Sequence, residues 1–120
     1  MVIISAAGMA AHLGGVLAAH TPLPVIGVPI KSGALKGVDA LYSTVMMPPG
    51  IPVAIVAIDG ARNAGILAAQ IIGIANPDVR AKIIALKEKM ARDVAAKSSL
   101  LAEIGVDGYL EAKGKKKDKK

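Results

Sequence analysis

Cysteine is absent from the 120-residue chain. Its absence excludes a disulfide framework and any thiolate nucleophile. The imidazole groups that could bind a metal are those of His12 and His20. These two residues stand eight apart in the sequence, with no acidic residue nearby. We therefore expect no metal site in this protein.

Bulky aromatic residues are almost as scarce, since the chain has no Phe, no Trp and only two Tyr. Apolar residues still make up 53% of the sequence, so the core must be built from Ala, Val, Ile, Leu and Met. Such small side chains allow helices to approach a sheet closely. A chain of this length buries only about two-thirds of its surface by itself. The high apolar content therefore favours further burial between subunits, and we expect a homo-oligomer.

Basic residues give a formal charge of +6, but they are concentrated at one end. Residues 113–120 hold six Lys and one Asp, a net charge of +5, which leaves only about +1 for the other 112 residues. Terminal runs of like charge are usually disordered and solvated, and no aromatic residues are interleaved to stack on bases. We expect a disordered tail over residues 112–120 and no specific nucleic-acid partner.

The apolar N-terminal stretch superficially resembles a signal peptide. No Lys or Arg precedes it, and His12 and several glycines interrupt it, which argues against both a leader and a membrane span. We expect a cytoplasmic protein with no membrane partner.

Residues 2–15 form the most informative stretch. Val2, Ile3 and Ile4 are typical of a strand buried on both faces, and Ser5 to Gly8 are small enough for a turn that lets a ligand approach the backbone. A helix start carrying His12 would follow, and its amides favour an anion. This pattern predicts a ligand site, and the alternative is ordinary packing of a helix on a strand through Gly and Ala.

The remaining segments alternate between strands and helices. In chain order the pattern predicts a helix at 9–19, a strand at 24–29, a turn at 31–33, a helix at 34–45, a loop at 46–52, a strand at 53–58 and a helix at 62–74. The second of these helices carries one apolar face, made of Leu35, Val38, Leu41, Tyr42 and Val45. This order indicates an α/β fold with a parallel sheet and helices on both faces.

A long amphipathic helix ends the chain. Asn76 is a typical N-cap residue, and Pro77 and Asp78 follow it in the first turn. Gly105 is predicted to end the helix. An apolar stripe runs along it through Val79, Ile83, Leu86, Met90, Val94, Leu101 and Ile104. The helix packs either on its own sheet or against a neighbouring subunit, and the sequence does not distinguish these two arrangements.

Four sequence blocks carry a family resemblance. They are Ala10-Ala11-His12-Leu13, residues 21–29 (Thr-Pro-Leu-Pro-Val-Ile-Gly-Val-Pro), residues 37–43 (Gly-Val-Asp-Ala-Leu-Tyr-Ser) and residues 47–53 (Met-Pro-Pro-Gly-Ile-Pro-Val). Together they resemble the 5-(carboxyamino)imidazole ribonucleotide mutase family of purine biosynthesis and the related aminoimidazole ribonucleotide carboxylases. The resemblance runs from Val2 to about Ile74 and continues weakly to Leu110.

The resemblance implies a three-layer αβα, flavodoxin-like domain with strand order 2-1-3-4-5. Matched by motif, this chain starts at the third strand, so we expect an N-terminally truncated sheet with three visible strands. The family's Gly-Ser-x-Ser-Asp and Ser-Ala-His-Arg-Thr-Pro motifs do not occur in it. We expect a partial domain at 1–75, a C-terminal helix at 76–111, and an exposed apolar edge at residues 2–5 that another copy of the chain covers.

The resemblance also assigns site residues. His12 matches a pocket histidine beside the imidazole and would be an auxiliary catalytic residue, although a structural helix-start histidine is the alternative. Met47 and Pro48 resemble a loop that closes a neighbouring subunit's site, with simple loop packing as the alternative. Substrate contacts are implied for Ser5, Ala6, Ala7, Gly8, Ala11 and Leu13. Gly14 stands where the family usually has Pro, which would loosen the helix start.

Three polar residues outside these blocks were also considered for the site. Lys31 and Ser32 would lie at the carboxyl-end crevice where open α/β sheets bind ligands, and Asp59 is best explained by local capping.

The implied reaction transfers a carboxylate on aminoimidazole ribonucleotide, with a nucleotide substrate and neither a metal nor an organic cofactor. The implied assembly is an octamer. The alternative function is that of a noncatalytic assembly protein that keeps the family's oligomer-forming part.

Overall fold

A computed structural model describes the backbone of residues 1–117 and the side chains through Lys113. Contacts within the chain divide it into two compact units, Met1–Ile83 and Ile84–Lys120. Each unit is described separately below. The predicted division at 1–75, 76–111 and 112–120 stays a prediction, and most of the Lys-rich tail lies outside the residues whose side chains are described.

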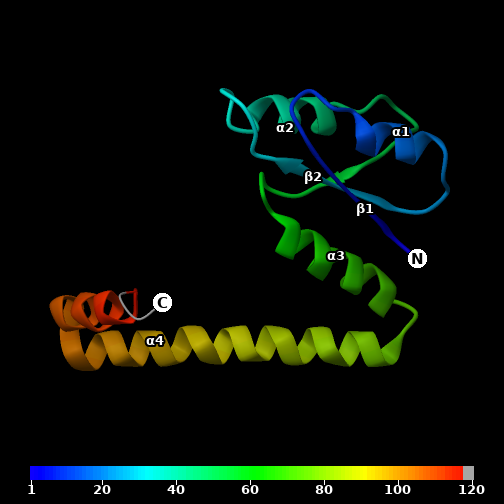
Figure 1. Ribbon diagram of the computed structural model, residues 1–120. Helices are drawn as coiled ribbons and strands as arrows, with labels where there is room; N and C mark the ends of the chain where they lie inside the picture. Colours follow the sequence, from blue (N-terminus) through cyan, green and yellow to red (C-terminus); the bar gives the residue numbers. More distant parts are fainter. Residues whose placement is uncertain (118–120) are drawn as a thin grey trace. The chain divides into compact units, whose positions relative to one another are not determined.

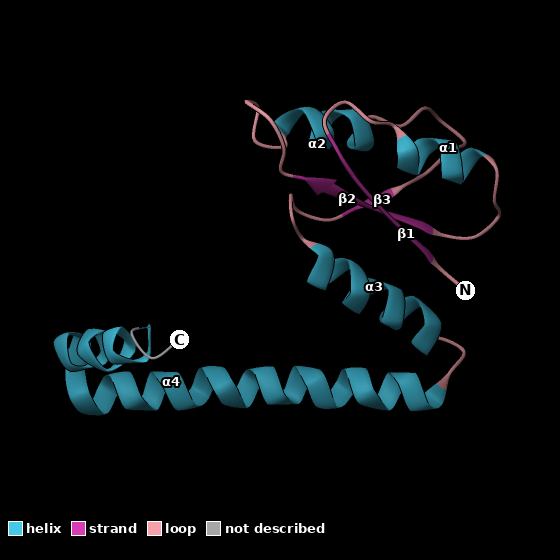
Figure 2. Cartoon of the chain, in the orientation of Figure 1, coloured by secondary structure: helices cyan, strands magenta, loops and turns pink. Residues whose placement is uncertain are grey.

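The first unit is built on a parallel sheet of three strands (Figures 1 and 2). The strands are β1 (Ile3–Gly8), β2 (Val25–Ile30) and β3 (Ala54–Ile55), in the order β1-β2-β3. Ile3 pairs with Val25 and Ile26 pairs with Ala54. Within the described residues β1 therefore forms one edge of the sheet, as expected. Of residues 2–5, however, only Ile4 is exposed, by about half, and Ser5 is buried.

Helices cover both faces of this sheet (Figure 1). α1 (Leu13–Ala19) and α2 (Val38–Val45) lie on one face, and α3 (Ala61–Gly73) lies on the other. The predicted three-layer α/β fold with a flavodoxin-like arrangement is confirmed.

The apolar core lies between β2 and α3. Ile26 and Val28 project from β2 onto Ala64 and Ala68 of α3, and all four residues are buried. Alternation along β2 explains this, because every second side chain points to the same face of a sheet. Alanines on α3 let this helix sit close to the branched side chains of the strand.

The opposite face of β2 is packed through much smaller groups. A Cβ atom added at Gly27 would lie 2.7 Å from Thr44 Cγ2 and 2.7 Å from Ile55 Cδ1. On α1, a Cβ atom at Gly14 would lie 3.7 Å from Ser5 Oγ. The close helix–sheet approach expected from the composition is present here.

The first predicted turn was misplaced. Residues 5–8 belong to β1, because Ala6, Ala7 and Gly8 pair with Val28, Pro29 and Ile30. The turn follows at Met9, whose φ of 59° is left-handed. As a result α1 begins at Leu13 instead of residue 9.

Two other boundaries also moved. α2 begins at Val38 instead of residue 34, because Gly33, Lys36 and Gly37 all have positive φ and form a turn. Regular pairing of β3 covers only Ala54–Ile55 of the expected 53–58. The chain nevertheless continues along β2, since the Asp59 amide donates to the Pro29 carbonyl at 2.9 Å.

The apolar face of α2 points away from the sheet. Val38, Tyr42 and Val45 are exposed, with Tyr42 at 65%, whereas Leu41 is half-buried. Leu35, which was predicted to belong to this face, is exposed in the turn before the helix. Ala40 and Thr44 are the buried residues of this helix. The helix therefore uses its small face for the sheet and leaves its bulky face unpacked.

The start of α4 (Pro77–Lys117) confirms the predicted cap. Asn76 Oδ1 accepts the Val79 amide at 3.1 Å. Arg80 Nε donates to the Gly73 carbonyl at 2.8 Å, and Arg80 Nη2 donates to the Ile74 carbonyl. The end of α3 is thereby tied to the first turn of α4.

The second unit is a helical hairpin. Gly105 is non-helical, with φ 69°, and the segment after it turns back along α4, so that Tyr109 and Ala112 line a cleft with Lys97 and Leu100 (Figure 1). Gly105 thus reverses the helix where a stop was predicted.

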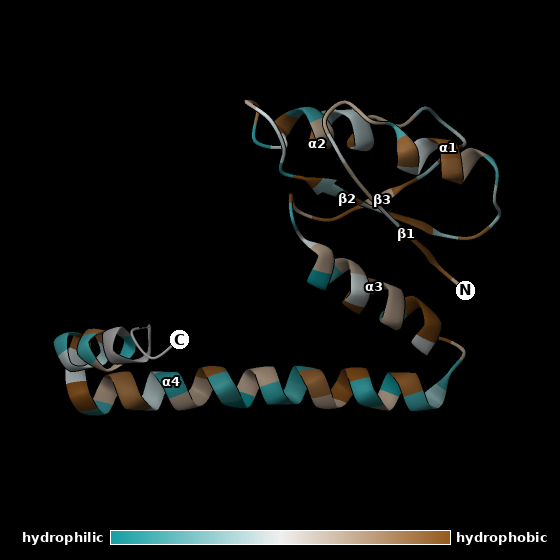
Figure 3. Cartoon of the chain, in the orientation of Figure 1, coloured by the Kyte–Doolittle hydropathy of each residue, from teal (hydrophilic) through white to brown (hydrophobic). Residues whose placement is uncertain are grey.

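Apolar and polar residues alternate along α4 (Figure 3), and Met90 and Val94 of the apolar stripe are exposed. Lys89 donates to Asp93 Oδ2 at 2.6 Å, and this hydrogen bond lowers the pKa of the Asp93 carboxyl. None of the described helices is long and apolar enough to cross a membrane.

Asp59 gives the first testable prediction. Its carboxylate accepts the Lys31 amide at 2.8 Å, and its φ is 58°. Asp59→Ala removes the acceptor and places alanine in a left-handed conformation, so we expect a loss of about 1–3 kcal/mol in the free energy of unfolding. Asp59→Asn keeps an acceptor and tolerates this conformation, so its loss is smaller. Urea titrations measure both, and equal losses for the two variants contradict this role.

Candidate functional site

The carboxyl edge of the sheet is closed by side-chain hydrogen bonds. Ser32 Oγ accepts the Met9 amide at 2.9 Å, just after β1 ends. A Cβ atom at Gly8 would lie 2.6 Å from the same hydroxyl oxygen. Asp59 ties the end of β2 to the turn before α3 through the Lys31 amide. The expectation that Lys31 and Ser32 lie at this edge is confirmed, and Asp59 caps the end of a strand instead of a helix.

His12 stands at the same edge, at the N-cap of α1. Its carbonyl accepts the Val16 amide at 3.1 Å. Its Nδ1 lies 2.6 Å from the carbonyl oxygen of Ser43 in α2. The imidazole therefore links the two helices that cover this face of the sheet.

Gly15 leaves the space that the imidazole occupies. A Cβ atom at Gly15 would lie 2.1 Å from His12 Nε2 and 2.6 Å from His12 Cδ2. No side chain fits there while the ring keeps this position.

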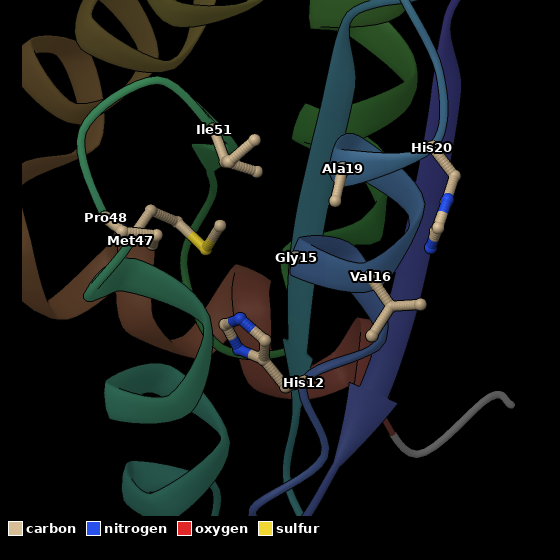
Figure 4. A pocket seen from close by; sticks show the side chains of 8 residues that line it. All are labelled: His12, Gly15, Val16, Ala19, His20, Met47, Pro48 and Ile51. Carbon is tan, nitrogen blue, oxygen red and sulfur yellow. The ribbon is translucent and has the colours of Figure 1, made fainter.

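A groove of about 270 Å³ lies beside the ring (Figure 4). We call it the His12 groove. It runs along α1 and is walled on the other side by the loop after α2. It is lined by His12, Gly15, Val16, Ala19, His20, Met47, Pro48 and Ile51. The walls of the groove are largely apolar.

The structure brings only some of the predicted site residues together. His12, Met47 and Pro48 share the His12 groove within one chain. Ser5 is buried beneath Gly14. The other predicted substrate contacts do not line this groove, and Ala6, Ala11 and Leu13 among them are exposed. The substrate roles of all these residues stay predictions.

Six residues that line the groove or contact the ring were not predicted as site residues, namely Gly15, Val16, Ala19, His20, Ser43 and Ile51. Of these, His20 is exposed at the surface and still lines the groove. The i, i+3 spacing of His12 and Gly15 was a usable signal, because residues three apart face each other on a helix. Ser43 offered no such signal, since it acts through its main chain. Among the described residues, no three His, Asp or Glu side chains gather as metal ligands.

The parallel sheet, its two helix layers and the polar carboxyl edge define an open α/β protein of flavodoxin-like type. Sequence comparison narrows this class to one family. The family model described as AIR carboxylase matches residues 1–93. The chain belongs to this family.

Curated relatives support the assignment. N5-carboxyaminoimidazole ribonucleotide mutase of Thermotoga maritima is 54% identical over 112 residues, which is 93% of this chain and 66% of that protein. The mutase of Pyrococcus abyssi is 58% identical over 92% of this chain and 63% of its own length. Phosphoribosylaminoimidazole carboxylase of Candida glabrata is 52% identical over 93% of this chain and 20% of its own. The chain thus spans just under two-thirds of the length of the mutases it matches.

The contact between Gly8 and Ser32 gives the second prediction. Gly8→Ala displaces the Ser32 hydroxyl from the Met9 amide, so we expect a loss of about 1–2 kcal/mol in the free energy of unfolding. Ser32→Ala removes the same hydrogen bond directly. The hydroxyl can be displaced only once, so the two losses should not add in the double variant. Chemical denaturation of the four proteins tests this, and additive losses contradict the coupling.

Proposed function

We propose that this protein takes part in carboxylate transfer on aminoimidazole ribonucleotide in purine biosynthesis, as a mutase-type isomerase. The proposal is carried by identity of more than half to mutases over nine-tenths of the chain. The family match at 1–93 also includes His12, the groove and the carboxyl edge of the sheet.

The proposed reaction balances within one molecule. The bond between the carboxylate and the exocyclic nitrogen breaks, and carbon dioxide is released beside the ring. The neighbouring ring carbon then forms a bond to this carbon dioxide. One proton leaves that carbon and one is taken up by the exocyclic nitrogen, so the protein has to hold a small neutral molecule and move a proton.

The chain offers parts that suit both tasks. The His12 groove has mostly apolar walls, which suit a small neutral molecule such as carbon dioxide. An imidazole can serve as a general acid or base, which fits the auxiliary catalytic role of His12. We assign the remaining substrate contacts to Ser5, Ala6, Ala7, Gly8, Ala11 and Leu13. We place the reaction in the cytoplasm and assign no cofactor.

Assembly into a homo-oligomer is the second part of the proposal. It is supported by the exposed apolar face of α2 and by the edge of β1, which pairs with no other strand among the residues that the structure describes. A second copy of the chain is the matching partner, because the body of the protein is nearly neutral and its exposed face is apolar. Met47 and Pro48 would then close a neighbour's site, with eight subunits by family resemblance.

The exposed face of α2 also favours a second candidate function. A noncatalytic assembly protein would keep this face and would need neither the His12 groove nor turnover. Activity measurements separate the two functions.

A substrate assay is the third prediction. With carboxyaminoimidazole ribonucleotide, the chain should convert substrate faster than solvent alone, and His12→Asn should abolish the difference. Asparagine keeps a donor near the position of Nδ1 but lacks Nε2, so the unfolding midpoint should change little. A wild-type rate at the solvent background overturns the enzymatic proposal and favours the assembly protein.

The oligomeric state is the fourth prediction. Light scattering of the wild-type chain should give a mass of several subunits. Tyr42→Glu places a charge in the exposed α2 face and should lower this mass, because burying an unpaired charge is unfavourable. Arg62→Glu, on the helix that covers the other face of the sheet, is the matched control and should leave the mass unchanged. A dilute monomer in the wild type contradicts self-association.

A further inference from the structure

Ser43 lies in the last turn of α2, where carbonyl groups have no N–H donor within the helix. Its carbonyl is one of the last four of α2 (Val38–Val45), which lack an intrahelical partner. The Ser43 hydroxyl donates back to the Asp39 carbonyl at 2.6 Å, so it does not fill this need. His12 Nδ1 lies 2.6 Å from the Ser43 carbonyl oxygen and is the hydrogen-bond partner of this carbonyl.

A carbonyl oxygen can only accept, so Nδ1 must carry the hydrogen of this bond. In the neutral imidazole Nε2 is then the unprotonated nitrogen. This is the reverse of free neutral histidine, in which the hydrogen prefers Nε2. The ring lines the His12 groove together with Met47 and Pro48 (Figure 4).

From these contacts we infer that the Ser43 carbonyl and Gly15 are positioning elements that hold His12 as the Nδ1–H tautomer, with Nε2 as its proton acceptor in the groove. Ser43 fixes the tautomer, and Gly15 leaves room for the ring in this orientation. The inference rests on the proposed function for its catalytic meaning. The tautomer itself is a property of the folded chain and can be measured without substrate.

The chain contains its own matched control for Gly15. Gly14 is the adjacent buried glycine of α1. A Cβ atom at Gly14 would meet Val53 Cγ1 at 3.5 Å and Thr44 Cγ2 at 3.7 Å, which are ordinary contacts. At Gly15 it would overlap the imidazole at 2.1 Å. Both alanines remove one helical glycine, so only the effect on the ring distinguishes them.

The fifth prediction is a nitrogen-15 experiment on the full chain labelled at histidine. Ring nitrogen shifts separate protonated from unprotonated nitrogens, and His20→Gln assigns the two histidines. Above the titration range, His12 should show a protonated Nδ1 and an unprotonated Nε2. Gly14→Ala should keep this pattern, and Gly15→Ala should shift His12 toward the mixture of free histidine.

Two results overturn the inference. One is a wild-type His12 that carries its hydrogen on Nε2, and this measurement stands even if Gly15→Ala fails to fold. The other is a Gly15→Ala chain that folds and keeps the wild-type tautomer. An inactive chain with the expected tautomer overturns the proposed function alone, whereas an active chain with Nε2–H overturns this inference alone.

Discussion

Close packing of α1 and α2 on the sheet is the constraint from which the other features follow. At Gly27 a hydrogen atom takes the place of a side chain where β2 meets α2, and at Gly15 it does so where α1 meets the His12 ring. A methyl group at Gly27 would already overlap Thr44 and Ile55. Interiors are packed at crystal-like density, so no side chain can be added at Gly27 while Thr44 and Ile55 keep their positions. The buried cluster of Ile26, Val28, Ala64 and Ala68 lies on the other face, between β2 and α3.

This constraint explains the exposed apolar face of α2. Helical periodicity places small residues on one side of α2 and bulky ones on the other. In most surface helices the bulky side faces the core. Here the narrow gap admits only Ala40 and Thr44, and Val38, Tyr42 and Val45 are left outside. A face of this kind is costly in water, since each Å² of apolar surface left exposed forgoes about 25 cal/mol of burial free energy.

The sequence predicted most of the fold but only part of the site. Strand and helix order followed from the periodicity and from the spacing of Gly and Pro, and the Asn76 cap followed from residue type. The end of β1 could not be predicted, because Ser5 to Gly8 extend only through pairing with β2. The outward orientation of the apolar face of α2 could not be predicted either, because an apolar stripe in the sequence does not show whether the stripe packs on the sheet or stays exposed. The link from His12 to Ser43 spans 31 residues and uses a main-chain atom, so no side-chain pattern encodes it.

The same small residues connect the packing to the chemistry. Without Gly15 the imidazole of His12 could not lie against α1, and without close packing of α1 and α2 it could not reach the Ser43 carbonyl. That carbonyl would then end α2 without a protein donor, and His12 would lose the partner that selects its tautomer. The short distance between these two helices therefore has two effects. It gives the Ser43 carbonyl at the end of α2 a hydrogen-bond donor, and it orients the proton acceptor of His12. Substitutions that widen this gap should affect the tautomer of His12 even when they lie far from its ring.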